Sequence, residues 1–171
     1  IAPSNAFDYI GLFNSAVQCD DPVAIIECQS LYQNSTLVPD GDLDYCIPFG
    51  KAKIVSSGDA CTIVTCANMV DVSVDAALEC EVNADIIDLR TVDPLSLDWE
   101  TIENSVRKTN RLLVVEQTAR GHSLGARIVQ EAQERLFDWL DHEILRVSGT
   151  NSAPVVSKPL ESAALAGLDD V

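Results

Sequence analysis

Residues 84–116 read ADIIDLRTVDPLSLDWETIENSVRKTNRLLVVE, and this stretch decides the fold. Its two ends, residues 84–89 and 111–116, are apolar runs of strand length. Between them, residues 98–107 have apolar side chains at helical spacing behind an aspartate suited to cap a helix. A helix between two strands returns the chain to the starting edge of the sheet, so the strands run parallel. The stretch therefore predicts a parallel β-α-β unit.

The alternation of strands and helices extends to both sides of this unit. Apolar residues at helical spacing form one stripe on residues 124–140, at Leu124, Ile128, Ala132, Leu136 and Leu140. Such alternation is typical of a sheet covered on both faces. We expect an α/β fold in which residues 51–171 form a three-layer domain with a mostly parallel, five-stranded sheet. Its strands are expected at residues 51–55, 61–67, 84–89, 111–116 and 143–147, and its helices at 69–81, 98–107 and 124–140.

The N-terminal residues predict a smaller piece of structure. Residues 4–19 have helical periodicity, with Ser4 as the expected N-cap, and residues 23–28 form an apolar run of strand length. One helix and one strand cannot bury a core alone, so residues 1–34 are interpreted as the end of a larger α/β domain. Residues 35–50 combine proline and glycine with aspartates and predict a linker.

The composition excludes some classes of partner. The chain of 171 residues has 27 acidic and 11 basic side chains and a net charge of −16, which repels nucleic acids and anionic membrane surfaces and favours a basic protein partner. No apolar run approaches the ~20 residues of a membrane span.

The first residues contain neither an initiator methionine nor a signal peptide, so we expect a processed or truncated chain. The six cysteines include no CxxC pair and are interpreted as reduced thiols of an intracellular protein.

Residues 121–125 read GHSLG and match the G-x-S-x-G pattern of serine hydrolases. The nucleophile of that class sits on a sharp turn directly between a strand and a helix, but four residues separate the expected strand end at Glu116 from this motif. His142 is the only histidine after Ser123, at the far end of a helix about 25 Å long. We therefore expect Ser123 to cap a helix and keep the hydrolase as the alternative function.

The end of the first helix is a possible cation site. The last carbonyl groups of a helix lack intrahelical partners and lie at the negative end of its dipole. If the chain curls at residues 16–21, several of these carbonyls can converge on a hard cation. A helix end capped by water is the alternative that the residues leave open.

Four segments together resemble one family, and they cover nearly the whole chain. The family is the β subunit of the thiamine-diphosphate-dependent, decarboxylating component of 2-oxo acid dehydrogenase complexes. Pyruvate and branched-chain 2-oxo acid dehydrogenases are examples. The segments are IAPSNA at 1–6 through DPVAIIE at 21–27, LY at 31–32 with IPFGKAK at 47–53, IDLRTVDPL at 87–95, and RLLVVE at 111–116 followed by Gly121 and GARI at 125–128.

The resemblance implies a transketolase C-terminal domain over residues 51–171, preceded by the end of a pyrimidine-binding domain. The glutamate and histidine that act on thiamine diphosphate, which binds with magnesium, lie upstream in this family. No catalytic or cofactor-binding residue is therefore expected in this chain, which alone is expected to be inactive. Transketolase and deoxyxylulose-phosphate synthase have similar last domains and are related alternatives.

The resemblance also implies binding positions. The family binds potassium through main-chain carbonyls that match Ala16, Val17, Cys19 and Asp21, and its acyltransferase-docking position matches Asp141. Glu27 is a candidate for the domain interface. The implied partners are an α subunit and a second β subunit, in an α2β2 tetramer, and the basic subunit-binding domain of a dihydrolipoyl acyltransferase. The implied compartment is the bacterial cytoplasm or the mitochondrial matrix.

Overall fold

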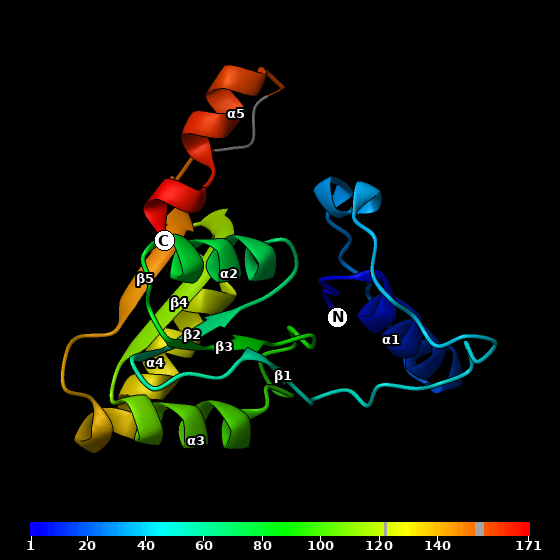
Figure 1. The fold of residues 1–171 in the computed structure, drawn as a ribbon, viewed down its shortest axis with the longest axis horizontal. Coiled ribbons are helices and arrows are strands. Elements are labelled where there is room, and N and C mark those ends of the chain that lie inside the picture. The colour runs from blue at the N-terminus through cyan, green and yellow to red at the C-terminus, as the bar shows by residue number, and fades with distance from the viewer. Residues whose placement is uncertain (122, 153–155) are drawn as a thin grey trace.

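The computed structural model describes residues 1–121, 123–152 and 156–171. It contains a sheet with its helices and, to one side of them, an N-terminal segment of residues 1–50 (Figure 1). The N-terminal segment contains helix α1 (Ala6–Gln18) and the 3₁₀ helix η1 (Gln29–Gln33). Residues 34–52 contain no helix or strand. The domain boundaries themselves stay a prediction.

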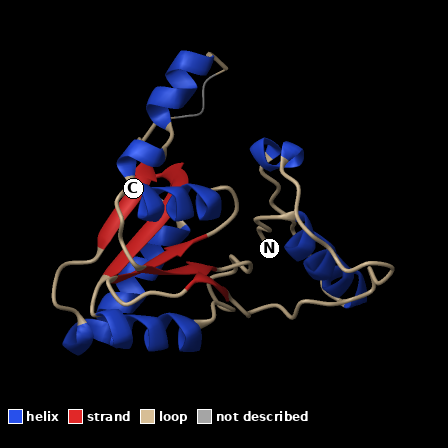
Figure 2. Ribbon diagram, viewed as in Figure 1, coloured by secondary structure: helices blue, strands red, loops and turns tan. Residues whose placement is uncertain are grey.

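The sheet has five strands in the order β1-β3-β2-β4-β5, and all its pairs are parallel except β1 with β3 (Figure 2). The mostly parallel, five-stranded sheet expected from the sequence is therefore confirmed. The strands are β1 (Lys53–Ser56), β2 (Cys61–Thr65), β3 (Ala84–Asp88), β4 (Leu112–Ala119) and β5 (Leu145–Gly149).

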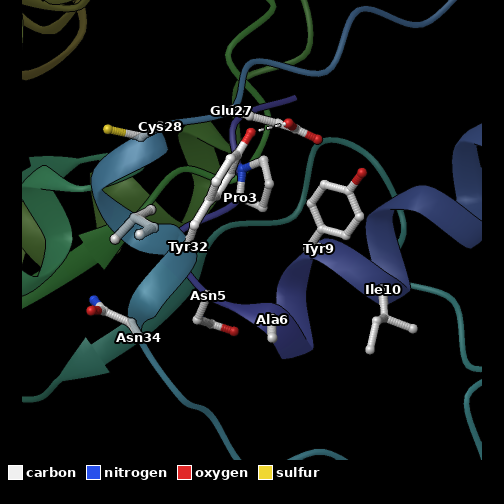
Figure 3. A pocket seen from close by; sticks show the side chains of 10 residues that line it. Pro3, Asn5, Ala6, Tyr9, Ile10, Glu27, Cys28, Tyr32 and Asn34 are labelled. Atoms are coloured by element: carbon white, nitrogen blue, oxygen red, sulfur yellow. Dashed lines mark hydrogen bonds between the residues drawn. The ribbon is translucent and has the colours of Figure 1, made fainter.

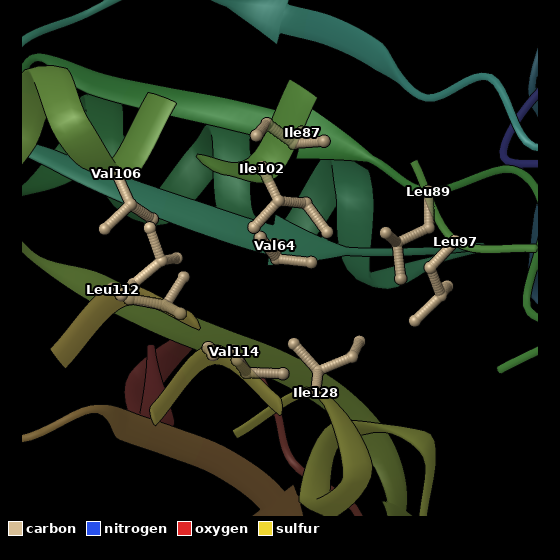
Figure 4. Packing of buried hydrophobic residues seen from close by; sticks show 11 residues of the cluster. Val64, Ile87, Leu89, Leu97, Ile102, Val106, Leu112, Val114 and Ile128 are labelled. Atoms are coloured by element: carbon tan, nitrogen blue, oxygen red, sulfur yellow. The ribbon is translucent and has the colours of Figure 1, made fainter. Parts of the chain in front are cut away.

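Helices cover both faces of the sheet. The helices are α2 (Met69–Glu79), α3 (Trp99–Thr109), α4 (Leu124–Leu136) and α5 (Lys158–Ala164), with short 3₁₀ helices at Phe137–Trp139 (η2) and Leu168–Asp170 (η3). Val64, Val114 and Ile128 belong to the larger core, under α3 and α4 (Figure 4). Met69 and Ile86 belong to the smaller core, under α2. None of the described helices is both long and apolar enough to cross a bilayer.

Two helix caps were predicted correctly. The side chain of Asp98 accepts a hydrogen bond from the backbone N–H of Thr101, and that of Ser123 accepts one from Ala126. The predicted cap of α1 is wrong. Asn5 accepts from the N–H of Asp8, because the hydroxyl of Ser4 instead donates to Asp88 in the sheet, at 2.6 Å.

Several elements differ from the sequence prediction. Strand β4 continues to Ala119 instead of ending at Glu116, and helix α5 was not predicted. Residues 23–28 are extended but form no strand, since their only strand-like partner among the described residues is Ile1, which bonds Ala24 and Ile26. The predicted helix 124–140 ends at Leu136 and continues as the 3₁₀ helix η2. Leu140 still packs against the larger core, so the apolar stripe persists although the helix has ended.

Candidate functional site

The carboxyl ends of β2 and β4 form the crevice of the sheet. The chain leaves β2 through α2 toward β3 on one side, and it leaves β4 through α4 toward β5 on the other. Ligands of open α/β sheets bind where the connections diverge in this way. A pocket of about 340 Å³ lies at this point, between the sheet and the extended residues 26–28. Its lining is mainly apolar and contains no lysine or arginine.

A buried carboxylate occupies the start of α4 at this crevice. Glu116, near the end of β4, accepts hydrogen bonds from the hydroxyl of Ser123 at 2.5 Å and from the backbone N–H of Gly125 at 2.9 Å. The guanidinium of Arg146 lies 3.9 Å from the same carboxylate. A helix N-terminus commonly binds phosphate through such free donors. Here the protein supplies the anion itself, so the site is closed to a phosphate.

The hydrolase alternative finds no support in the structure. Ser123 has an unstrained, extended backbone and both caps α4 and donates to Glu116. Ser123 follows the carboxyl end of β4, whereas His142 precedes the amino end of the parallel strand β5, beside Arg111. The carboxyl end of β4 and the amino end of β5 lie at opposite ends of these two parallel strands, so Ser123 and His142 do not meet. His122 of the GHSLG motif lies outside the described residues.

A buried polar cluster joins the N-terminal segment to the sheet. Asp8 of α1 is fully buried and forms an ion pair with Arg90, just beyond β3. The carboxylate of Asp88 accepts from the hydroxyl of Ser4 at 2.6 Å and from the backbone N–H of Arg90 at 3.0 Å. Asn5 donates to Asp8 at 2.6 Å. One cation thus faces two buried carboxylates. Sequence reasoning missed this cluster, although charged residues directly before and after Leu89, in an otherwise apolar run, were a signal.

Burial raises the pKa of Asp88 to about 6, because it outweighs the hydrogen bonds from Ser4 and Arg90, which lower the pKa. The nearby charge of Asp8 raises the pKa by a smaller amount. The folded state therefore binds the proton more tightly than the unfolded state, whose aspartates have the ordinary value of 3.8. This contribution to stability is complete below about pH 4 and is lost as the pH rises through 6.

We expect Asp88→Asn to remove this pH dependence. The stability of the variant relative to wild type should rise by up to about 3 kcal/mol between about pH 4 and pH 7, measured by urea unfolding. Asp85→Asn is the control. Burial raises the pKa of Asp85, but bonds from Lys108 and Ser105 outweigh it and hold the pKa below its usual value. Asp85 therefore titrates below this pH window, and Asp85→Asn should not change the pH dependence of stability within it. A stability difference between Asp88→Asn and wild type that stays constant from about pH 4 to pH 7 would contradict the prediction.

The predicted potassium ligands lie where α1 ends. Cys19 follows the helix in an extended conformation, and its N–H donates to the carbonyl of Ala16 at 3.3 Å. Val17 and Asp21 are exposed. No group of three histidine, cysteine, aspartate or glutamate side chains forms a metal site among the described residues. Carbonyl ligation of potassium is a different chemistry, and it stays a prediction.

The two remaining predicted positions are exposed. Glu27 accepts from the hydroxyl of Tyr32 at 2.6 Å and lines the crevice pocket, where the N-terminal segment meets the sheet. The backbone N–H of Asp141 donates to the carbonyl of Asn110 at 2.9 Å, and the side-chain amide of Asn110 donates to the carbonyl of Trp139. These bonds fix Asp141 on the surface. Their roles in the domain interface and in docking stay predictions.

Comparisons with known proteins agree with this fold. The family model of the transketolase C-terminal domain matches residues 50–171. The pyruvate dehydrogenase E1 component subunit beta of Rickettsia conorii is 41% identical over 178 aligned residues, which cover 100% of this chain and 52% of that protein. A mitochondrial subunit of the same name from Arabidopsis thaliana is 37% identical, over 100% of this chain and 48% of that protein.

A solved structure entitled split gene transketolase, inactive beta4 tetramer, superposes with a TM-score of 0.72 over 98% of this chain and 52% of that one. At 21% identity this likeness shows the fold alone. The chain spans about half the length of the curated relatives that it matches, as their C-terminal half. It therefore belongs to the transketolase C-terminal domain family and is homologous over its whole length to the β subunits of the pyruvate dehydrogenase E1 component.

Proposed function

We propose that this chain serves as the C-terminal half of the β subunit of a 2-oxo acid dehydrogenase. The intact enzyme decarboxylates a 2-oxo acid on thiamine diphosphate and transfers the acyl group to lipoyl-lysine. The observation that carries the proposal is the 41% identity to an E1 subunit beta across the entire chain. We assign this half to subunit assembly and docking. The relatives come from bacteria and mitochondria, so the bacterial cytoplasm and the mitochondrial matrix are the two proposed compartments.

The described residues do not fit the diphosphate of the cofactor. The crevice pocket contains no basic side chain, and Glu116 already engages the donors at the start of α4. In this proposal, thiamine diphosphate and its magnesium ion are held by other parts of the enzyme. No catalytic or cofactor-binding residue is assigned to this chain, and the chain alone is inactive.

The end of α1 suits a structural potassium ion. Because α1 ends at Gln18, the carbonyl groups of its last turn have no continuing helix to accept from. Ala16 accepts one bond from Cys19, and a carbonyl oxygen has a second lone pair for a cation. Carbonyls of Val17, Cys19 and Asp21 complete the proposed set. Replacing potassium by lithium should lower the midpoint of thermal unfolding of the intact subunit, and an unchanged midpoint would contradict this assignment.

Asp141 is the proposed contact to the basic domain of the acyltransferase. It follows η2 on a surface that also exposes Phe137 and Trp139, and the bonds through Asn110 hold its backbone in place. A lysine or arginine of a partner would form a charge-assisted hydrogen bond with its carboxylate. The α subunit and a second β subunit complete the proposed α2β2 tetramer.

A chimera tests the proposed function. The C-terminal half of the Rickettsia conorii β subunit is replaced by this chain and co-expressed with the α subunit of the same enzyme. We expect an α2β2 tetramer by light scattering and pyruvate decarboxylation with an artificial electron acceptor. The same β subunit truncated at the junction is the control. An assembled but inactive tetramer, or no tetramer, would contradict the proposal.

The same chimera tests the docking position. Asp141→Ala should weaken binding to the acyltransferase core at least about tenfold at low salt, because a desolvated charge pair that loses one member costs on the order of 2–5 kcal/mol. Acceptor-linked decarboxylation should stay unchanged. An effect under about 1 kcal/mol would identify Asp141 as a solvated surface residue.

A further inference from the structure

A second pocket lies within the N-terminal segment and shares Glu27 with the crevice pocket. Helix α1 and the 3₁₀ helix η1 enclose about 390 Å³ (Figure 3). Tyr9 of α1 and Tyr32 of η1 form two of its walls, and Glu27 lies at its rim beside both. Pro3, Ala6 and Ile10 also line the pocket and contribute apolar surface.

The rim of this pocket is anionic. The hydroxyl of Tyr32 donates to Oε2 of Glu27 at 2.6 Å. Hydrogen bonding from Tyr32 and then from Tyr9 lowers the pKa of Glu27, while the carboxylate raises the pKa of both phenols. At neutral pH the cluster is thus one carboxylate with two protonated tyrosines. Glu27 forms no ion pair within the described part of the chain, and no lysine or arginine lines the pocket.

Two aromatic rings beside an unpaired carboxylate are complementary to an organic cation. A cation over a tyrosine face is attracted by the negative face of the ring, and this attraction is stronger when the cation is desolvated. A charge-assisted bond to the carboxylate adds to this attraction. The same carboxylate repels phosphates and carboxylates, and the net charge of −16 draws cations toward the chain.

We propose that this pocket binds an alkylammonium group. Its charged head lies between Glu27 and the two tyrosines, and its aliphatic stem lies against Pro3, Ala6 and Ile10. A guanidinium is the poorer fit, because Tyr32 already occupies Oε2 and a bidentate fork needs both carboxylate oxygens. An ammonium needs only one acceptor. The group can come from a free alkylamine or from a lysine side chain of another polypeptide.

Titration of the chain with n-butylammonium, followed by NMR of the tyrosine rings, tests the proposal. The resonances of Tyr9 and Tyr32 should shift with a Kd in the millimolar range, near −4 kcal/mol. Tyr45 is the internal control, because its hydroxyl donates to the carbonyl of Phe7, outside this pocket. 1-Butanol, which has the same stem without the charge, should cause no saturable shift.

Two variants separate charge from shape. Glu27→Gln should weaken n-butylammonium binding at least about tenfold, whereas Tyr32→Phe, which keeps the ring, should weaken it less. Both side chains are exposed, so neither change should lower the thermal midpoint noticeably. Equal binding of 1-butanol, unchanged binding by Glu27→Gln, or no shift at all would overturn the proposal.

A further titration with Nα-acetyl-lysine amide distinguishes the two sources. Binding at least about tenfold tighter than that of n-butylammonium would identify a lysine of a polypeptide as the ligand, since its backbone adds contacts at the rim. Weaker binding would identify a free amine.

Discussion

Replacing Arg90 by alanine should lower the free energy of unfolding by about 3–5 kcal/mol, because the change leaves a fully buried carboxylate without its cation. Asp8 is 0% exposed, and Arg90 is the only cation paired with it among the described residues. Asp88, two residues before Arg90, adds a second buried carboxylate to the same site. The cluster joins α1 to the end of β3, so its loss should also release the N-terminal segment from the sheet.

Urea unfolding of the chain measures this loss, and hydrogen exchange of α1 measures the release. Arg90→Lys should recover part of the stability, because an ammonium retains the charge but not the guanidinium geometry. Lys158→Ala is the matched control, since Lys158 is paired with Glu161 but 88% exposed, and it should leave the free energy of unfolding nearly unchanged. A loss of the same small size for Arg90→Ala would show that water reaches Asp8.

Replacing Gly125 by alanine should cost about 2–4 kcal/mol. A Cβ atom at this position would lie 2.4 Å from Oε1 and 2.5 Å from Cδ of Glu116. Overpacking of this kind costs typically about 1–3 kcal/mol, and displacing the carboxylate also weakens its bonds from Ser123 and Gly125. Glu116 is only 6% exposed, and moving its carboxylate toward the crevice pocket that it lines would break these two bonds.

Gly167→Ala is the control for this variant, because an added Cβ there meets no atom within 4 Å and the φ angle of −128° suits any residue. A double-mutant cycle with Glu116→Ala locates the cause. If the carboxylate is the obstacle, Gly125→Ala should cost under about 1 kcal/mol once Glu116 is truncated. An equal cost in both backgrounds would point to the helix backbone instead.

The sequence correctly predicted the elements in which the local spacing of apolar residues matches the face that packs against the core. The stretch 84–116 forms β3, α3 and β4, because its apolar spacing matches both the element and the core that the element faces. The helix caps at Asp98 and Ser123 were predictable for the same reason. The strand predicted at residues 23–28 is absent, because a strand needs a partner strand and a local sequence pattern does not supply one.

The errors at the sites have a different origin, in contacts between distant residues. Ser4 and Asn5 are both good capping residues, and the choice is made by Asp88, 84 positions beyond Ser4, which takes the serine hydroxyl. The role of Ser123 as a cap was predictable, but its bond to Glu116 depends on how β4 ends beside α4. No spacing within the sequence reports such a contact, and the ion pair of Asp8 with Arg90 was missed for the same reason.

The carboxylate at the start of α4 has a consequence for how this domain can change in evolution. Glu116 acts as a tethered counter-ion that keeps the ligand-binding edge of an α/β sheet permanently satisfied. This site is stable without a ligand, but its hydrogen-bond donors are no longer available to bind an anion from solution. A single substitution of this glutamate by a small neutral residue would free the amide of Gly125 and the hydroxyl of Ser123. One substitution at Glu116 would thus leave two hydrogen-bond donors at the start of α4 available to an external anion.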